Sequence, residues 1–180
     1  MTRLLKIFKI YLVISVAASG LYIFMAHIFF NPTISLRRGY YFAYQSQHYS
    51  VGDTVLICVV TDKYVRVLRQ LHLPVVTDAC ANGTPYLLKR IVAVGGDRVL
   101  IDIQGVSVNG ELQPNSRALN AYQQIHLLPS AFAQYELGAN QFFVLGETAH
   151  SYDSRYFGVL IKSQIMGIAW LIWPRDTPLW

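Results

Sequence analysis

The chain has 180 residues, of which 53% are hydrophobic and 14% are charged, and its formal net charge is +5. This length fits one domain with its own core plus an appendage. Three positive charges lie at the extreme N-terminus, on Arg3, Lys6 and Lys9, and the rest of the chain holds 12 basic and 10 acidic residues. That near balance gives no reason to expect a nucleic-acid partner, so we predict none.

An apolar run at residues 10–30 follows the basic residues, and its only acid or base is His27. About 20 apolar residues are enough to cross a bilayer as a helix. The positive charges before the run favour a cytoplasmic N-terminus. We therefore predict a cytoplasmic n-region at 1–9, a transmembrane signal anchor at 10–30 and a periplasmic domain at 31–180, on a single-pass protein of the bacterial inner membrane.

A cleavable signal peptide is the alternative for this segment. Ala17-Ala18-Ser19 has the small residues of a cleavage site. The apolar run continues past it through Phe30, however, which favours an anchor that is retained.

The remainder alternates short runs of Val, Ile, Tyr and Phe with Gly and Asn, which predicts a mainly β domain. Asn109-Gly110 marks a tight hairpin. Residues 114–138 are polar and irregular and predict no element. The predicted strands are Tyr40–Tyr44, Thr54–Val60, Tyr86–Val94, Arg98–Ile103, Gly105–Val108, Gln141–Leu145 and Gln164–Trp173.

Two cysteines, Cys58 and Cys80, flank a stretch that breaks the β pattern. Val65, Leu68 and Leu71 recur there at helical spacing, so we predict a short helical insertion within residues 61–85. A disulfide persists in an exported domain, and we take the two cysteines as a disulfide candidate. The alternative is a pair of buried free thiols. Two cysteines are too few for a metal cage, and no metal is predicted.

Lys89 stands in the strand predicted at residues 86–94. At strand period it shares a face with Leu87, Ile91 and Ala93, where an ammonium ion is poorly solvated. Desolvation lowers a lysine pKa and makes the amine a possible base near neutral pH. On the strand alone, an edge lysine whose stem covers apolar surface is the more common arrangement.

Two further segments favour the catalytic interpretation of Lys89. Ser35 follows the anchor within a few residues, which places a hydroxyl close to the membrane surface. Residues 146–158 are dense in polar groups between two predicted strands.

With these segments the chain resembles the signal peptidase I family of Ser/Lys proteases, and within it the TraF-type conjugative-transfer peptidases. Ser35 is followed by Leu36-Arg37-Arg38 rather than by the Met-x-Pro of housekeeping enzymes. The resemblance implies a signal peptidase/LexA-like β catalytic domain without a cofactor. The motifs that carry it are Asn31 to Gly39, Gly52 to Leu56, Lys89-Arg90 through Gly95-Gly96-Asp97, and Ser151 to Gly158.

The resemblance and the chemistry together assign roles to these residues. Ser35 is the expected nucleophile and Lys89 its base. Ser151 is expected to orient the Lys89 amine through a hydrogen bond, and the Thr33 hydroxyl to help form the oxyanion hole. Asp153 and Arg155 are expected to form an ion pair on one strand face, which Arg90 joins.

The resulting prediction is a membrane-anchored serine endopeptidase that removes signal peptides from conjugative pilin precursors, with pilin cyclisation as a second outcome of the acyl-enzyme. Its expected partners are a membrane-tethered pilin precursor or other preprotein, and the lipid bilayer. A housekeeping signal peptidase I and a non-catalytic scaffold of a secretion apparatus are the alternatives. A Ser/His/Asp triad through His150 lacks a nucleophile-elbow pattern and is disfavoured.

Overall fold

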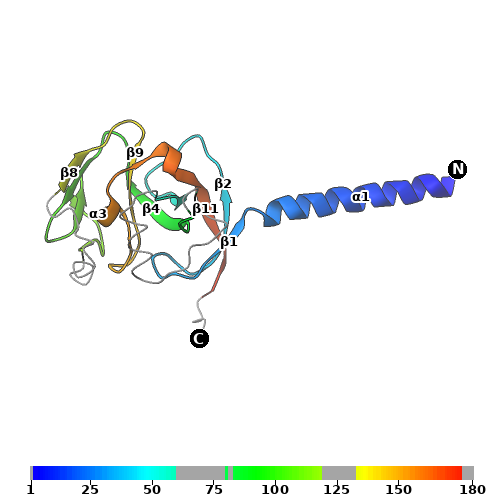
Figure 1. Ribbon diagram of the computed structural model, residues 1–180, viewed down its shortest axis with the longest axis horizontal. Coiled ribbons are helices and arrows are strands. Elements are labelled where there is room, and N and C mark those ends of the chain that lie inside the picture. Colours follow the sequence, from blue (N-terminus) through cyan, green and yellow to red (C-terminus); the bar gives the residue numbers. More distant parts are fainter. Residues whose placement is uncertain (1, 60–79, 81–82, 119–132, 176–180) are drawn as a thin grey trace.

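A long helix stands apart from a β domain in the computed structural model (Figure 1). The structure describes residues 2–59, 80, 83–118 and 133–175. Most of the predicted helical insertion at 61–85, and part of the interval 114–138, lie outside these residues. Cys80, inside the insertion, forms a disulfide with Cys58, and their Cα atoms are 5.5 Å apart.

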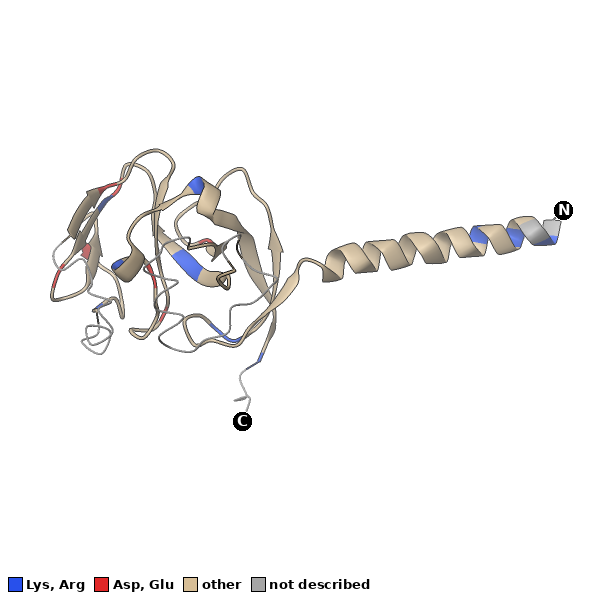
Figure 2. Ribbon diagram, viewed as in Figure 1, with Lys and Arg blue, Asp and Glu red and all other residues tan. Residues whose placement is uncertain are grey.

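Helix α1 spans Thr2–Met25, and its residues Leu5–Met25 are long and apolar enough to cross a membrane. None of this window is buried against the rest of the protein. The basic residues near the N-terminus lie at the end of the helix that is remote from the β domain (Figure 2). This arrangement is the one expected of a membrane anchor.

The apolar run predicted as one anchor at 10–30 is divided in the structure. The helix ends at Met25, and Ile28–Asn31 forms strand β1, which pairs antiparallel with β2 at Gly39–Tyr44. The predicted C-terminal boundary was therefore wrong. Hydropathy alone could not place it, because strand β1 is as apolar as the helix that precedes it.

In the described part of the chain, the larger sheet has seven strands in the order β1-β2-β11-β3-β4-β9-β10. Strand β4 lies between β3 and β9, and both neighbours run antiparallel to it. The helices α3 and η2 follow β9 in the chain. The remaining elements of this sheet region are β3 Thr54–Ile57, β4 Leu87–Ala93, β9 Gln141–Leu145, α3 Ser154–Phe157, β10 Leu160–Ile161, η2 Lys162–Gln164 and β11 Ile165–Pro174.

The smaller sheet has the order β7-β6-β5-β8. Its strands are β5 Arg98–Ile101, β6 Val106–Val108, β7 Glu111–Leu112 and β8 Ala133–Glu136. The hairpin predicted at Asn109-Gly110 is confirmed, with φ of 51° and 88° at its two central residues. Such positive φ values match the twist of the flanking strands.

Among the described residues, the buried apolar side chains form three clusters. One cluster joins the two sheets, because Val99 and Val106 of the smaller sheet pack with Phe143 and Leu145 of β9. Another contains Leu36, which follows Ser35 in its loop, together with Leu88 of strand β4. The mainly β prediction is confirmed, and the predicted strands occur with boundaries shifted by a few residues. Strands β1, β8 and β10 and helix α3 were not predicted.

Candidate active site

Lys89 is buried in the middle of strand β4, where it is opposite Val55 of β3 and only 2% exposed. Its neighbours Leu88 and Ile91 are buried as well. Burial lowers the pKa of Lys89 from 10.5 to about 8, while the Asp153 charge raises it and the Arg155 charge lowers it. About one amine in ten is then neutral at pH 7, a far larger fraction than in an exposed lysine.

Ser35 is half-buried in the loop between β1 and β2, and the side chain of Asn31 braces that loop. The Asn31 amide nitrogen donates to the carbonyl oxygens of Thr33, Leu36 and Arg37 at 3.3 to 3.4 Å. Its Oδ1 accepts from the Thr33 backbone N–H at 3.1 Å. One buried side chain therefore holds the backbone on both sides of Ser35.

Asn31 is a positioning residue that sequence reasoning left without a role. The sequence signal was present, because an Asn two residues before a Thr commonly closes a turn through its side chain. Asn31 opens the motif Asn31 to Gly39, which carries the resemblance but does not by itself show what the Asn31 side chain does. Its function in the loop depends on contacts up to six residues away.

Thr33 contacts Ser35 as well as Asn31. Its hydroxyl donates to Asn31 Oδ1 at 2.8 Å and lies 3.2 Å from Ser35 Oγ. The Thr33 proton thus has an acceptor already, so the predicted oxyanion role requires the hydroxyl to rotate away from Asn31.

The segment after β9 connects the Ser35 loop to strand β4. Arg90 pairs with Leu145, so one further residue of the same antiparallel register brings Gly146 opposite Lys89. A Cβ atom at Gly146 would collide with the Ser151 side chain and lie 2.9 Å from the Ser35 carbonyl oxygen. That carbonyl accepts the Glu147 backbone N–H at 2.6 Å. Gly146 is therefore the point where the three candidate segments meet.

Asp153 and Arg155 form a fully buried ion pair, with Arg155 Nη2 2.7 Å from Asp153 Oδ2. Asp153 also caps helix α3 and accepts the Gly146 backbone N–H at 2.9 Å. The pair therefore fixes the polar segment that carries Ser151. Within the described residues, the Arg155 guanidinium also donates to the backbone carbonyls of Asn115, Arg117, Thr148, Ala149 and Ser151.

Two details of the predicted network were wrong. Asp153 and Arg155 belong to the cap and first turn of α3 rather than to a strand. Arg90 does not join them, because its Nη2 binds Glu147 Oε1 at 2.6 Å. Within the described residues Ser151 Oγ is buried without a hydrogen-bond partner, and its role in orienting the Lys89 amine stays a prediction.

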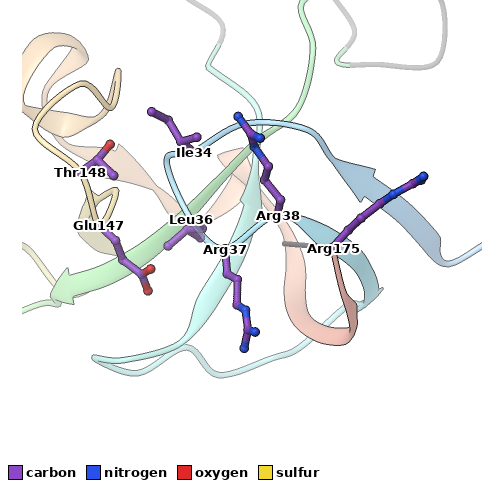
Figure 3. Close-up of a pocket in the computed structure, with 7 residues that line it drawn as sticks. All are labelled: Ile34, Leu36, Arg37, Arg38, Glu147, Thr148 and Arg175. Carbon is purple, nitrogen blue, oxygen red and sulfur yellow. The ribbon is translucent and has the colours of Figure 1, made fainter. Parts of the chain in front are cut away.

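A pocket of about 460 Å³ opens beside Ser35. Figure 3 shows Glu147 and Thr148 on one side of it and Arg37, Arg38 and Arg175 on the other, with Leu36 between them. The space adjoins the backbone on both sides of Ser35 and is suited to hold part of a peptide. His150, the alternative base, is exposed.

Three comparisons place these features beside known proteins. The sequence profile described as signal peptidase, peptidase S26, matches residues 2–174. Two plasmid transfer proteins TraF from Escherichia coli are 38% identical over 88 residues and 35% identical over 91 residues. These matches cover 48% and 49% of this chain and 49% and 51% of the relatives, so the chain spans about half the length of the curated relatives it matches.

A solved structure of a signal peptidase I from Enterococcus faecalis is also similar. It matches with a TM-score of 0.36 and 16% sequence identity, over 68% of this chain and 97% of that structure.

Proposed function

Because the chain belongs to the signal peptidase family, peptidase S26, we propose that it is a membrane-anchored serine endopeptidase with a Ser35/Lys89 dyad. The observation that carries the proposal is a fully buried lysine whose pKa is lowered to about 8. The Ser35 loop is tied by backbone contact to the segment opposite that lysine.

Ser35 Oγ attacks the carbonyl carbon of the cleaved bond while neutral Lys89 accepts its proton, since an unassisted hydroxyl is a weak nucleophile. The Ser35 N–H and the Thr33 hydroxyl stabilise the developing oxyanion. The resulting lysine ammonium then protonates the leaving amine, and the C–N bond breaks to leave an ester on Ser35. Water activated by Lys89 hydrolyses that ester and regenerates the enzyme.

Ser151 acts on Lys89 rather than on the substrate. Its hydroxyl is buried without a partner among the described residues, and it lies against Gly146, which the sheet register brings opposite Lys89. We propose that this hydroxyl forms a hydrogen bond that orients the Lys89 amine when substrate is bound. Proton transfer requires the lysine nitrogen within hydrogen-bond reach of Ser35 Oγ when substrate is bound.

The proposed substrates are the precursors of conjugative pilins, and the similarity to plasmid transfer proteins supports this choice. Cyclisation requires a second cleavage, near the C-terminus of the pilin. The Ser35 ester then holds the pilin's C-terminal acyl group, and the downstream segment leaves as an amine. Attack of the pilin's own amino terminus on this ester, in place of water, forms a peptide bond, releases Ser35 and makes the product circular. Helix α1 holds the site at the membrane. The basic residues at the N-terminal end of α1 favour a cytoplasmic N-terminus and a periplasmic catalytic domain.

The test is incubation of the full-length protein in membranes with its cognate pro-pilin, followed by mass measurement of the product. Ser35→Ala and Lys89→Ala are expected to abolish processing. The matched controls are Ser50→Ala, at an exposed position, and Lys162→Ala, at a half-buried one, and both are expected to retain it. A circular product weighs one water less than the linear one. Unchanged cleavage in either dyad variant would refute the dyad.

Two further measurements separate the alternatives. Cleavage of many unrelated preproteins at the rate of the pilin precursor would indicate a housekeeping enzyme. Absence of Ser35 labelling by an acylating probe, in protein that is folded, would indicate a scaffold without activity.

A further inference from the structure

The pocket beside Ser35 carries an excess of positive charge. Arg37 and Arg38 come from the Ser35 loop, and Arg175 follows strand β11. Among the described residues that line the pocket, Glu147 alone is acidic, and its carboxylate binds Arg90 at 2.6 Å. The Glu147 charge is therefore already paired with a guanidinium that does not line the pocket.

Two of the arginines are placed to bind a ligand. The Arg38 Nε atom is buried and has no hydrogen-bond partner within the described part of the chain. The Arg175 side chain is exposed, while its backbone N–H donates to the Arg38 carbonyl at 3.0 Å. This backbone bond holds the two residues next to each other. A buried donor without an acceptor is costly, and a bound anion would satisfy it.

We propose that this pocket binds a carboxylate of the substrate within about four residues of the cleaved bond. Guanidinium groups match the planar geometry of a carboxylate and bind it through paired hydrogen bonds. Arg38 is three residues from Ser35, and an extended chain covers at most about 3.6 Å per residue, so the Cα atoms of the two residues are at most about 11 Å apart. The proposal rests on the proposed role of Ser35, because it places the carboxylate relative to that nucleophile.

The carboxylate has two possible sources, an acidic side chain or the free C-terminus of a short leaving segment. An anionic lipid head group is the competing occupant. The position of the pocket favours the peptide: Ile34 and Leu36, the two neighbours of Ser35, both line it. A lipid bound there would occupy the space that the substrate backbone needs.

The test uses peptides that span the cleavage site of the cognate pro-pilin, with a single Glu or Gln at about four positions on each side. A second pair differs only in a free or amidated C-terminus. Binding to full-length Ser35→Ala protein in neutral detergent is measured by fluorescence anisotropy. We expect one Glu peptide, or the free C-terminus, to bind at least about tenfold more tightly than its uncharged partner, which equals about 1.4 kcal/mol.

The two variants Arg38→Gln and Arg175→Gln are introduced singly and together in the Ser35→Ala protein. We expect each to bring the ratio of the two dissociation constants, uncharged peptide over charged peptide, towards one. Arg98→Gln is the matched control, because Arg98 pairs with Glu136 on the smaller sheet. It is expected to leave the ratio unchanged. If Arg38→Gln does not fold, the exposed Arg175→Gln variant still decides the result.

A ratio near one for every peptide pair, or a preference that survives the double variant, would overturn the proposal. Binding of the same arginine variants to phosphatidylglycerol vesicles is compared with their binding to phosphatidylcholine vesicles. If the variants change only the binding to phosphatidylglycerol, the pocket binds lipid and the proposal is overturned. Peptides could bind with the expected charge preference and still not be cleaved by protein with Ser35 intact. That result would refute the proposed function and leave the carboxylate pocket supported.

Discussion

Replacing Lys89 by methionine is expected to abolish activity and to stabilise the protein. The lysine loses its charge more readily in the folded state, where its pKa is about 8, than in the unfolded state, where it is 10.5. Below pH 8 both states are protonated, and the folded state carries the cost of a desolvated ammonium ion. The difference in pKa, at 1.36 kcal/mol per unit, makes that cost about 3 kcal/mol.

The sign of the pH dependence follows from proton binding. Between pH 8 and pH 10.5 the unfolded chain binds more protons than the folded protein at this site, so the free energy of unfolding rises with pH. Lys89→Met lacks this rise. We therefore expect the variant to be more stable than the wild type by up to about 3 kcal/mol at neutral pH. The advantage should disappear above pH 10.5.

The measurement is urea unfolding of both full-length proteins in neutral detergent across this pH range. Other titrating groups and helix α1 contribute equally to both proteins, so they cancel in the difference. Lys162→Met provides the control, because the Lys162 amine binds the Gln47 carbonyl in an exposed position. The reasoning would be refuted if the difference in free energy of unfolding between wild type and Lys89→Met did not change with pH. It would also be refuted if the wild type were the more stable of the two at neutral pH.

Three further changes test the supports of the site. Arg155→Met leaves the buried Asp153 carboxylate unpaired, so unfolding in urea should become easier by about 3 to 5 kcal/mol. Arg155 also lowers the pKa of Lys89, so the midpoint of the rate profile should move to higher pH. Asn31→Ala removes the loop brace, and cleavage of pro-pilin should fall by up to about 10² from misplacement of Ser35. Replacing both Cys58 and Cys80 by serine opens the disulfide across 22 residues and should lower the free energy of unfolding by about 3 kcal/mol, without moving the rate profile.

The sequence predicted those parts of the site that depend on local pattern. Alternation along residues 86–94 placed Lys89 in an apolar row, and the structure buries it there. The hairpin at Asn109-Gly110 required only two residues that accept positive φ. Both signals are complete within a few neighbouring positions.

The missed features depend on contacts between distant segments. Arg90 binds Glu147, 57 residues away, and no local pattern distinguishes that partner from Asp153. Strand β1 exists because it pairs with β2, whereas its composition continues that of the anchor helix. Helix α3 is one turn long and begins at an Asp153 cap, and the sequence alone fits a strand equally well.

The buried Asp153–Arg155 pair resolves a conflict within the site. Asp153 is needed to cap α3 and to bind the Gly146 N–H, yet a lone carboxylate near Lys89 would hold that lysine protonated. The Arg155 charge lowers the pKa of Lys89 and so opposes the effect of Asp153, and the remaining Arg155 donors bind the backbone around Ser151. A buried ion pair contributes little net stability compared with well-packed apolar residues. Its value here is that it fixes a polar loop beside Lys89 and leaves burial as the main influence on the pKa of the base.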